Sequence, residues 1–199
     1  MSDLTITLAG DSVDKKTGGE VLSANKKLTQ MKVDIIDVSI TLPDDGSCTA
    51  GDMIFAPVKI ENALGVKGGS GILQSITAIV QNHGTEASAD GTDVGTFDLY
   101  FTSDATTTNF SGASAQASAA TVATSVMNNL CGKVTISNMT DVGRQAVGDK
   151  SNIGMVVKSS STTRDLYVWA VAQSTNDYDG GTMVLRLGIV QDYCFLLEE

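Results

Sequence analysis

The feature that most constrains the fold is a strict alternation of apolar and other residues close to the end of the chain. Between residues 183 and 190, the apolar residues at every second position are Met183, Leu185, Leu187 and Ile189. Successive side chains of a β-strand point to opposite faces, so these four share one face, while Arg186 and Gly188 share the other. The segment is therefore predicted to be a strand with one face in a core.

Similar short segments recur from residue 33 onward, separated by loops rich in Gly, Ser, Thr, Asn and Asp. The predicted strands are residues 36–41, 54–60, 72–81, 97–101, 134–136, 153–157, 166–173 and 183–190. The chain has twenty glycines but only two prolines, so its turns must rely largely on Gly, Asn and Asp. We predict an all-β fold, a jelly roll or β-sandwich of about eight or nine antiparallel strands.

Some of these strands carry a further indication of their place in a sheet. Pro57 lacks a backbone N–H, which favours an edge position for 54–60. Val168 and Trp169 make 166–173 apolar on both faces, which predicts a central strand, with the closing strand 183–190 beside it. Phe97, Leu99 and Phe101 are expected to face inward, and Asp98 and Tyr100 outward.

One segment has helical rather than strand spacing. Val122, Val126 and Leu130 recur at every fourth position, and Gly132 follows where a helix C-terminus favours glycine. One short helix is predicted here.

The first 32 residues differ in charge from the rest of the chain. They hold five lysines and four acidic residues, a net charge of +1, which leaves −11 for the remainder of a chain whose net charge is −10. We predict an extended N-terminal arm over residues 1–32 and a β-domain over 33–199. The arm combines a short alternating strand with two Lys-Lys pairs, so its candidate partner-binding residues are Leu4, Ile6, Leu8, Lys15, Lys16, Lys26 and Lys27. The alternative is a solvated tail without a role.

The composition argues against several partners and chemistries. The net charge of −10 and the isoelectric point of about 4.4 oppose nucleic acid or anionic lipid as the main partner. No N-terminal signal peptide is recognisable, and no apolar run approaches the roughly 18 residues that span a membrane. Cys48, Cys131 and Cys194 are odd in number and widely spaced, which predicts free thiols in a protein made in a cytoplasm.

Catalytic and ligand-binding motifs were sought without success. His83 is the only histidine, so no general base and orienting group can be assembled around it, and no catalytic residue, metal site or cofactor is predicted. The glycine-rich segment 68–71 lacks the Lys-Ser/Thr of a phosphate loop and is interpreted as a kink at the start of a strand. The segment 10–12, Gly-Asp-Ser, lacks the partners of a hydrolase nucleophile.

Two binding sites stay open as weaker alternatives. The acidic loop residues that could hold calcium are Asp44, Asp45, Asp90, Asp93, Asp177 and Asp179, although their spacing matches no known calcium loop. The aromatic residues that could stack on a sugar are Tyr100, Tyr167, Tyr178 and Trp169, for which core packing is the favoured interpretation.

The order of several segments resembles a family of small virion structural proteins of tailed bacteriophages. The segments that carry this resemblance are 34–41, 50–52, 68–77, 97–104, 130–136, 152–158, 165–168 and 185–192. Together they span residues 33–193, so the arm lies outside the match. The family pattern has a Tyr near Cys48 and a Lys-Asp-Asp-rich turn where this chain has Gln81-Asn-His-Gly84, so these two loops are expected to make different contacts.

The resemblance implies a non-enzymatic virion component, namely a head decoration or cement protein. Such a protein would bind the outer surface of the major capsid protein lattice, stabilise the head and be made in the host cytoplasm. It would associate with itself, with a trimer favoured, and would need no nucleic acid, membrane or cofactor. The rival hypotheses are a receptor- or carbohydrate-binding module and a tail or neck component.

Overall fold

The computed structural model describes most of the chain from residue 32 onward and two short pieces before it. The described residues are 7–8, 11–12, 32–42, 47–81, 94–104, 110–111, 121–122, 124–137, 139–142, 145–174, 176–177 and 181–191. The chain divides into two units, residues 1–31 and 32–199. In the first unit, β1 (Thr7–Leu8) pairs antiparallel with β2 (Asp11–Ser12).

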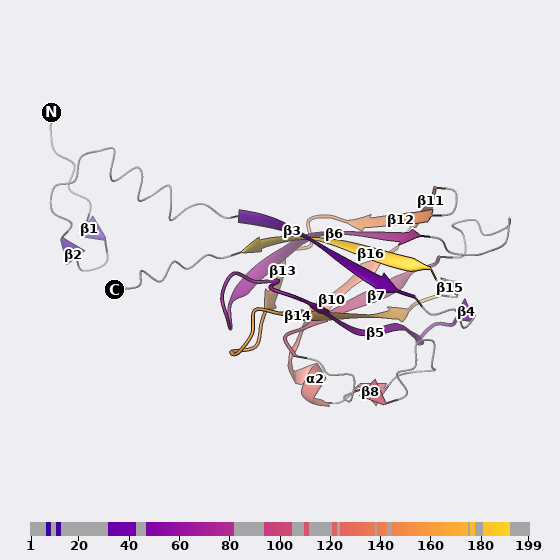
Figure 1. Ribbon diagram of the computed structural model, residues 1–199, viewed down its shortest axis with the longest axis horizontal. Coiled ribbons are helices and arrows are strands. Elements are labelled where there is room, and N and C mark those ends of the chain that lie inside the picture. The colour runs from indigo at the N-terminus through magenta and orange to yellow at the C-terminus, as the bar shows by residue number, and fades with distance from the viewer. Residues whose placement is uncertain are drawn as a thin grey trace. The chain divides into compact units, whose positions relative to one another are not determined.

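The second unit is built from two antiparallel sheets that face each other (Figure 1). The four-stranded sheet has the order β10 (Leu130–Ile136), β7 (Phe97–Thr102), β14 (Leu166–Ala172) and β5 (Met53–Ile60). The six-stranded sheet has the order β11 (Thr140–Asp141), β12 (Gln145–Lys150), β6 (Ser70–Gln81), β16 (Thr182–Gln191) and β3 (Lys32–Thr41), and β13 (Met155–Lys158) also pairs with β6. The smaller elements are β4 (Ser47–Cys48) with β15 (Asn176–Asp177), β8 (Phe110–Ser111) with β9 (Thr121–Val122), and the helix α2 (Thr124–Asn128). For the residues that the structure describes, the prediction of an all-β sandwich with one short helix is confirmed.

The pairing of the long strands is nested. The first, β3, pairs with the last, β16, and the second, β5, pairs with β14. Further in, β6 pairs with β12 and β13, and β7 pairs with β10. Such a chain is a long hairpin folded over on itself, with β16 beside β6 and β14 beside β7 completing the two sheets. This is the strand arrangement of a jelly roll.

The core lies between the sheets and is filled by the alternating residues that the sequence indicated. The predicted inward residues that are buried there are Val38, Ile40, Phe97, Leu99, Phe101, Leu185, Leu187 and Ile189. Ile36 is half-buried and packs against the margin of this cluster. Burial of apolar side chains on one face of each strand is therefore what holds the two sheets together.

The predicted place of the closing strand is wrong. β14 is central, as expected, and β5 with Pro57 is at an edge, as expected, but β16 lies in the other sheet, between β6 and β3. Both β14 and β16 are strongly apolar, and their similar composition suggested that they were neighbours. They are instead central strands of two different sheets. A strand's composition indicates how much of it is buried and does not indicate which strand lies beside it.

The predicted helix is also too long. α2 covers only residues 124–128, while Val122 belongs to β9 and Leu130 begins β10. Gly132 lies inside β10, with a φ of +159°, and does not end the helix. All three apolar residues nevertheless pack into one small cluster with Trp169. Their spacing therefore indicates that the three side chains are buried together, although they belong to β9, α2 and β10.

Candidate partner-binding surfaces

The predicted partner-binding residues fall almost entirely outside the described part of the chain. Leu8 lies in β1, where it is the register partner of Asp11 in β2. The candidates outside the described residues are Leu4, Ile6, Lys15, Lys16, Lys26 and Lys27. Their role stays a prediction. The surfaces that could receive a partner are therefore considered on the second unit, residues 32–199, which is called the β-body below.

The two edges of the four-stranded sheet are poorly suited to pairing with a further strand. β5 contains Pro57, which lacks a donor, and its register with β14 shifts twice. β10 has a register shift between Leu130 and Gly132, and the Cys131 thiol lies against the backbone of Lys158 in β13. Interruptions of this kind protect sheet edges from unwanted pairing.

The two edges of the six-stranded sheet differ from each other. Along one edge, β12 and β13 are separated by residues 151–154, where Asn152 and Gly154 adopt positive φ angles of 55° and 66°. Along the other edge, β3 runs for ten residues without proline, glycine or a register shift against β16. Among the described strands, β3 pairs with β16 alone. Among the edges of the two described sheets, the β3 edge is the longest one without an interruption.

The outer face of the six-stranded sheet carries a row of apolar side chains that ends at this edge. The strand registers align Val156 with Ile72, Ile72 with Val190, and Val190 with Val33. Val33 is 57% exposed and Val156 is 63% exposed, and Ile35, two residues along β3, is 69% exposed. None of these belongs to the described core clusters. This row was not predicted from the sequence, although the consecutive pair Ile35-Ile36 indicates that β3 is apolar on both faces.

A charged row lies farther along the same face. Arg186 pairs in register with Asp37 and donates two hydrogen bonds of 2.9 Å to its carboxylate. These hydrogen bonds and the positive charge hold the pKa of Asp37 below its ordinary value. Both side chains are about half exposed, so the ion pair contributes little to stability. Its main effect is that this part of the outer face is charged and not apolar.

The outer face of the four-stranded sheet is covered around Asp98. Asp98 points away from the main core, as expected, but it is only 1% exposed. Lys133 Nζ lies 2.6 Å from one carboxylate oxygen, and the Thr135 hydroxyl donates a 2.5 Å hydrogen bond to the other. The carboxylate raises the pKa of Lys133 through this hydrogen bond and its charge. A charge-assisted network satisfies the buried carboxylate, so the side chain need not reach solvent.

The aromatic side chains considered for sugar stacking are packed against each other on this covered face. Tyr100 and Trp169 stack with ring centroids 5.3 Å apart and planes 10° apart. Trp169 is 2% exposed, and it forms a cluster with Met53 and Val126 against which Tyr167 packs. Tyr178 lies outside the described residues. Core packing, the favoured interpretation of Trp169, is confirmed.

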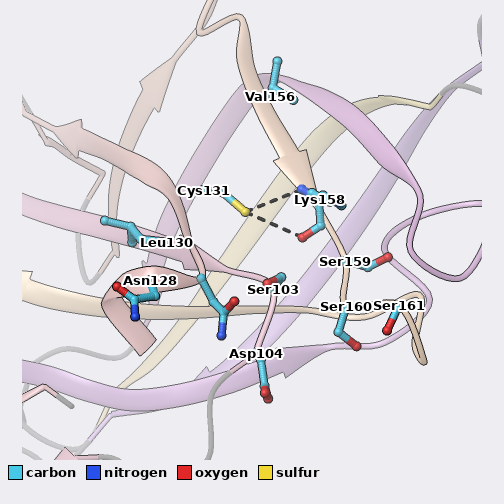
Figure 2. Close-up of a pocket in the computed structure, with 11 residues that line it drawn as sticks. Ser103, Asp104, Asn128, Leu130, Cys131, Val156, Lys158, Ser159, Ser160 and Ser161 are labelled. Carbon is cyan, nitrogen blue, oxygen red and sulfur yellow. Dashed lines mark hydrogen bonds between the residues drawn. The ribbon is translucent and has the colours of Figure 1, made fainter. Parts of the chain in front are cut away.

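An open, polar hollow of about 620 Å³ lies beside α2, at the start of β10 and the end of β13 (Figure 2). Its lining includes Asp104, Asn128, Cys131 and the serines 159–161. The Cys131 thiol is engaged with the backbone N–H and carbonyl of Lys158, at 3.5 and 3.6 Å, and burial raises its pKa above the ordinary value. A thiol held in this way is a poor nucleophile, because the thiolate is the reactive form.

The remaining sequence candidates give little support to a catalytic or metal site. Within the described residues, no group of three His, Cys, Asp or Glu side chains could hold a metal ion, and no helix is long and apolar enough to cross a membrane. Cys48 and Cys131 are not joined in disulfides within the described part of the chain, while Cys194, His83 and the side chains of the six acidic calcium candidates lie outside it. Gly68, with a φ of +65°, precedes the start of β6, as expected for a kink.

Comparisons with known proteins give distant similarities only. No family model matches the chain, and no curated protein matches it. A chain from the structure of Desmodium yellow mottle tymovirus is similar over 81% of this chain and 87% of its own length, with 12% identity and a TM-score of 0.26. A chain from the capsid asymmetric unit of cyanophage Pam1 is similar over 81% of this chain and 85% of its own length, with 13% identity and a TM-score of 0.28.

Proposed function

We propose that this protein is a non-enzymatic structural component of a phage virion, a decoration or cement protein that binds the outer surface of the major capsid protein lattice and stabilises the head. The observation that carries the proposal is the place of the segments that resemble small virion proteins. Most of them map onto β3, β6, β7, β10, β13, β14 and β16, the long strands of the jelly roll. The resemblance therefore concerns the framework of the fold and not a single loop.

The shape of the β-body suits a binding role in a repeated lattice. A jelly roll holds its surfaces rigidly, because each sheet is fixed by pairing along its full length and by the core between the sheets. The body carries an outer sheet face with Val33, Ile35 and Val156 more than half exposed. Exposed apolar side chains that share a face are typical of surfaces that contact another protein.

The arm, residues 1–32, is proposed to be the assembly element. Its net charge is +1 and that of the remaining chain is −11, so it is attracted to acidic surfaces of a neighbouring subunit. This attraction weakens with salt, since the screening length is only about 8 Å at physiological ionic strength. A short alternating strand at the start of the arm would add backbone hydrogen bonds and apolar contacts.

A sugar-binding function is less well supported. Sugar sites commonly present an exposed aromatic face, whereas Trp169 is buried and stacked on Tyr100. The polar hollow near Cys131 offers hydroxyl and amide groups without an aromatic platform. A receptor-binding tip or a neck component would place the protein at the tail, which the experiment below distinguishes from the head.

The test is to add the purified protein to heads of its phage assembled without it. We expect saturable binding at repeated sites of the lattice, visible by cryo-electron microscopy, and greater resistance of the heads to heat and to dilution of salt. A variant with Lys15, Lys16, Lys26 and Lys27 changed to Glu should bind the heads more weakly. Density for this chain at the tail or neck of the intact virion, with none on the head, would refute the decoration role.

A further inference from the structure

We propose that the edge of β3 that faces away from β16, where no further described strand pairs, is the acceptor site for the strand 4–8 of a second copy of this chain, so that copies associate head to tail by strand addition. This inference rests on the assembly role proposed for the arm and adds to it the identity of the receiving surface. Association of the protein with itself can be measured without virus particles, so this proposal is tested separately from binding to phage heads.

The edge of β3 is the one edge of the described sheets that is ready to accept a strand. Pro57 and register shifts interrupt β5, a register shift interrupts β10, and residues 151–154 separate β12 from β13. β3 offers ten residues in one continuous register, from Lys32 to Thr41. Long, regular edges are the places where proteins pair with another chain.

The apolar row on the outer face makes this edge selective for an apolar strand. The row runs across β13, β6 and β16 and ends at Val33, and Ile35 lies exposed two residues along the edge strand. A strand added beside β3 would place alternate side chains directly next to these two residues, at the usual cross-strand Cβ separation of about 5 Å. The best occupant is therefore a segment that is apolar at every second position.

The start of this chain has that pattern. Leu4, Ile6 and Leu8 alternate with Thr5 and Thr7, so one face of such a strand is apolar and the other is hydroxylated. Within the first unit β1 pairs with β2. Pairing with β2 occupies one edge of β1, which leaves the second edge for an acceptor.

The length of chain between the two segments allows a neighbour to be reached. Residues 9–31 separate the donor segment from the start of β3, and an extended chain of that length spans roughly 75 Å. Once the arm comes within the screening length of about 8 Å, its net positive charge and the acidic remainder of a second copy attract each other. A second copy is therefore the occupant that the alternating pattern, the charge and the reach of the arm favour.

Donor and acceptor are different surfaces, so copies can link head to tail as well as exchange arms reciprocally in a dimer. In the head-to-tail arrangement each copy gives its arm to one neighbour and receives an arm from another, a heterologous interface that closes into a ring when the rotation between copies allows it. The trimer expected from the sequence is one such ring.

The experiment uses full-length variants in sedimentation velocity over a range of concentrations. Ile35→Lys blocks the acceptor by placing a charge on an exposed position of β3, and Ile6→Asp blocks the donor. We expect each variant alone to associate about tenfold more weakly or worse than the unmodified chain. Mixing them should restore association and stop at a one-to-one complex, because one variant keeps an intact arm and the other an intact edge.

Matched controls separate this mechanism from its alternatives. Val142→Lys introduces the same charge at a residue that is 61% exposed and lies outside β3, and Leu22→Asp changes the arm outside the donor strand; both should associate normally. Val156→Lys lies at the far end of the apolar row, so a loss as large as that of Ile35→Lys would show face-to-face contact and overturn edge addition. Circular dichroism and thermal unfolding verify that each variant is folded.

Three further results would overturn the proposal. Unchanged association of Ile35→Lys would exclude the β3 edge, and a mixture that does not associate would exclude the donor and acceptor pair. A monomeric unmodified chain at all concentrations would show that the arm does not link copies. If Ile35→Lys still binds phage heads while its self-association is lost, the decoration role stands independently of how copies associate.

Discussion

At the scale of single residues, Asp165 shows how one carboxylate fixes a turn at the end of the sandwich. Asn62 adopts a φ of 52°, in the left-handed region that few residues other than glycine occupy. The backbone N–H of Asn62 donates a 2.9 Å hydrogen bond to Asp165, and Lys59 Nζ lies 3.1 Å from the second carboxylate oxygen. The hydrogen bond from Asn62 is the main reason why the pKa of Asp165 lies below its ordinary value, and Lys59 adds to it.

We therefore predict that Asp165→Ala lowers the free energy of unfolding by about 1–3 kcal/mol at neutral pH, because it leaves the Asn62 N–H without its acceptor. A lowered pKa in the folded state means that the stabilisation is complete above the unfolded pKa of about 3.9 and disappears as the pH falls through the folded value. The difference between the two proteins should thus be constant from pH 6 to 8 and shrink below about pH 4. Urea unfolding at a series of pH values measures it.

Glu61→Ala is the matched control for this prediction. Glu61 also lies beside Lys59, at 3.4 Å, but its side chain is 73% exposed, so its removal should change stability by at most about 0.5 kcal/mol. Equal losses for the two variants would mean that the hydrogen bond to Asn62 has no special role.

At the scale of elements, α2 acts as a lid over the outer face of the four-stranded sheet. Figure 1 shows the helix beneath this sheet, on the side away from the six-stranded one. Val126 is 1% exposed and packs with Trp169, whereas Met127, on the same five-residue helix, is 46% exposed. The lid therefore explains why β14 is apolar on both faces: the main core covers one face and the cluster under α2 covers the other.

We predict that Val126→Asp opens the lid without unfolding the sandwich. The buried charge should cost about 1–3 kcal/mol. Trp169 is the only tryptophan, so its emission reports the cluster directly and should shift to longer wavelength as water reaches the ring. Met127→Asp adds the same charge at the exposed position and should leave the emission unchanged. A spectrum that is the same for both variants would show that α2 does not shield the ring.

At the scale of the whole molecule, the two units have separate hydrogen-bonded strands. β1 pairs with β2, while β3 to β16 form the sheets of the body and their small appended ribbons. The body begins at Lys32 with β3, whose residues Val38 and Ile40 belong to the main core. The main core is therefore built from residues of the second unit.

We predict that a chain cut before Lys32 unfolds at the same urea concentration as the full chain, at protein concentrations where both are monomeric. A chain cut before Leu42 is the control, since it also lacks β3 with Val38 and Ile40 and should lose cooperative unfolding. A clear drop in the midpoint on removal of residues 1–31 alone would show that the arm supports the fold of its own body.

The sequence by itself determined the strands and the faces that they bury. Alternation at every second residue is a local property, imposed by the geometry of a single strand, so Phe97, Leu99 and Phe101 could be assigned to the core without knowing their neighbours. Pro57 gave the edge position of β5 for an equally local reason, the lack of a backbone donor.

Only the tertiary structure decided which strands are neighbours and what covers their outer faces. Pairing joins residues far apart in sequence, such as Leu187 with Ile36 and with Ile76, and many pairings of apolar strands bury similar areas. Spacing also misled for Val122, Val126 and Leu130, which share a burial site and not a helix. An apolar outer face has the same sequence pattern whether it is buried or exposed. Trp169 is buried under α2, whereas Val33 and Ile35 are exposed to solvent. The pattern cannot distinguish these cases, because the segment that covers a strand is remote from it in the sequence.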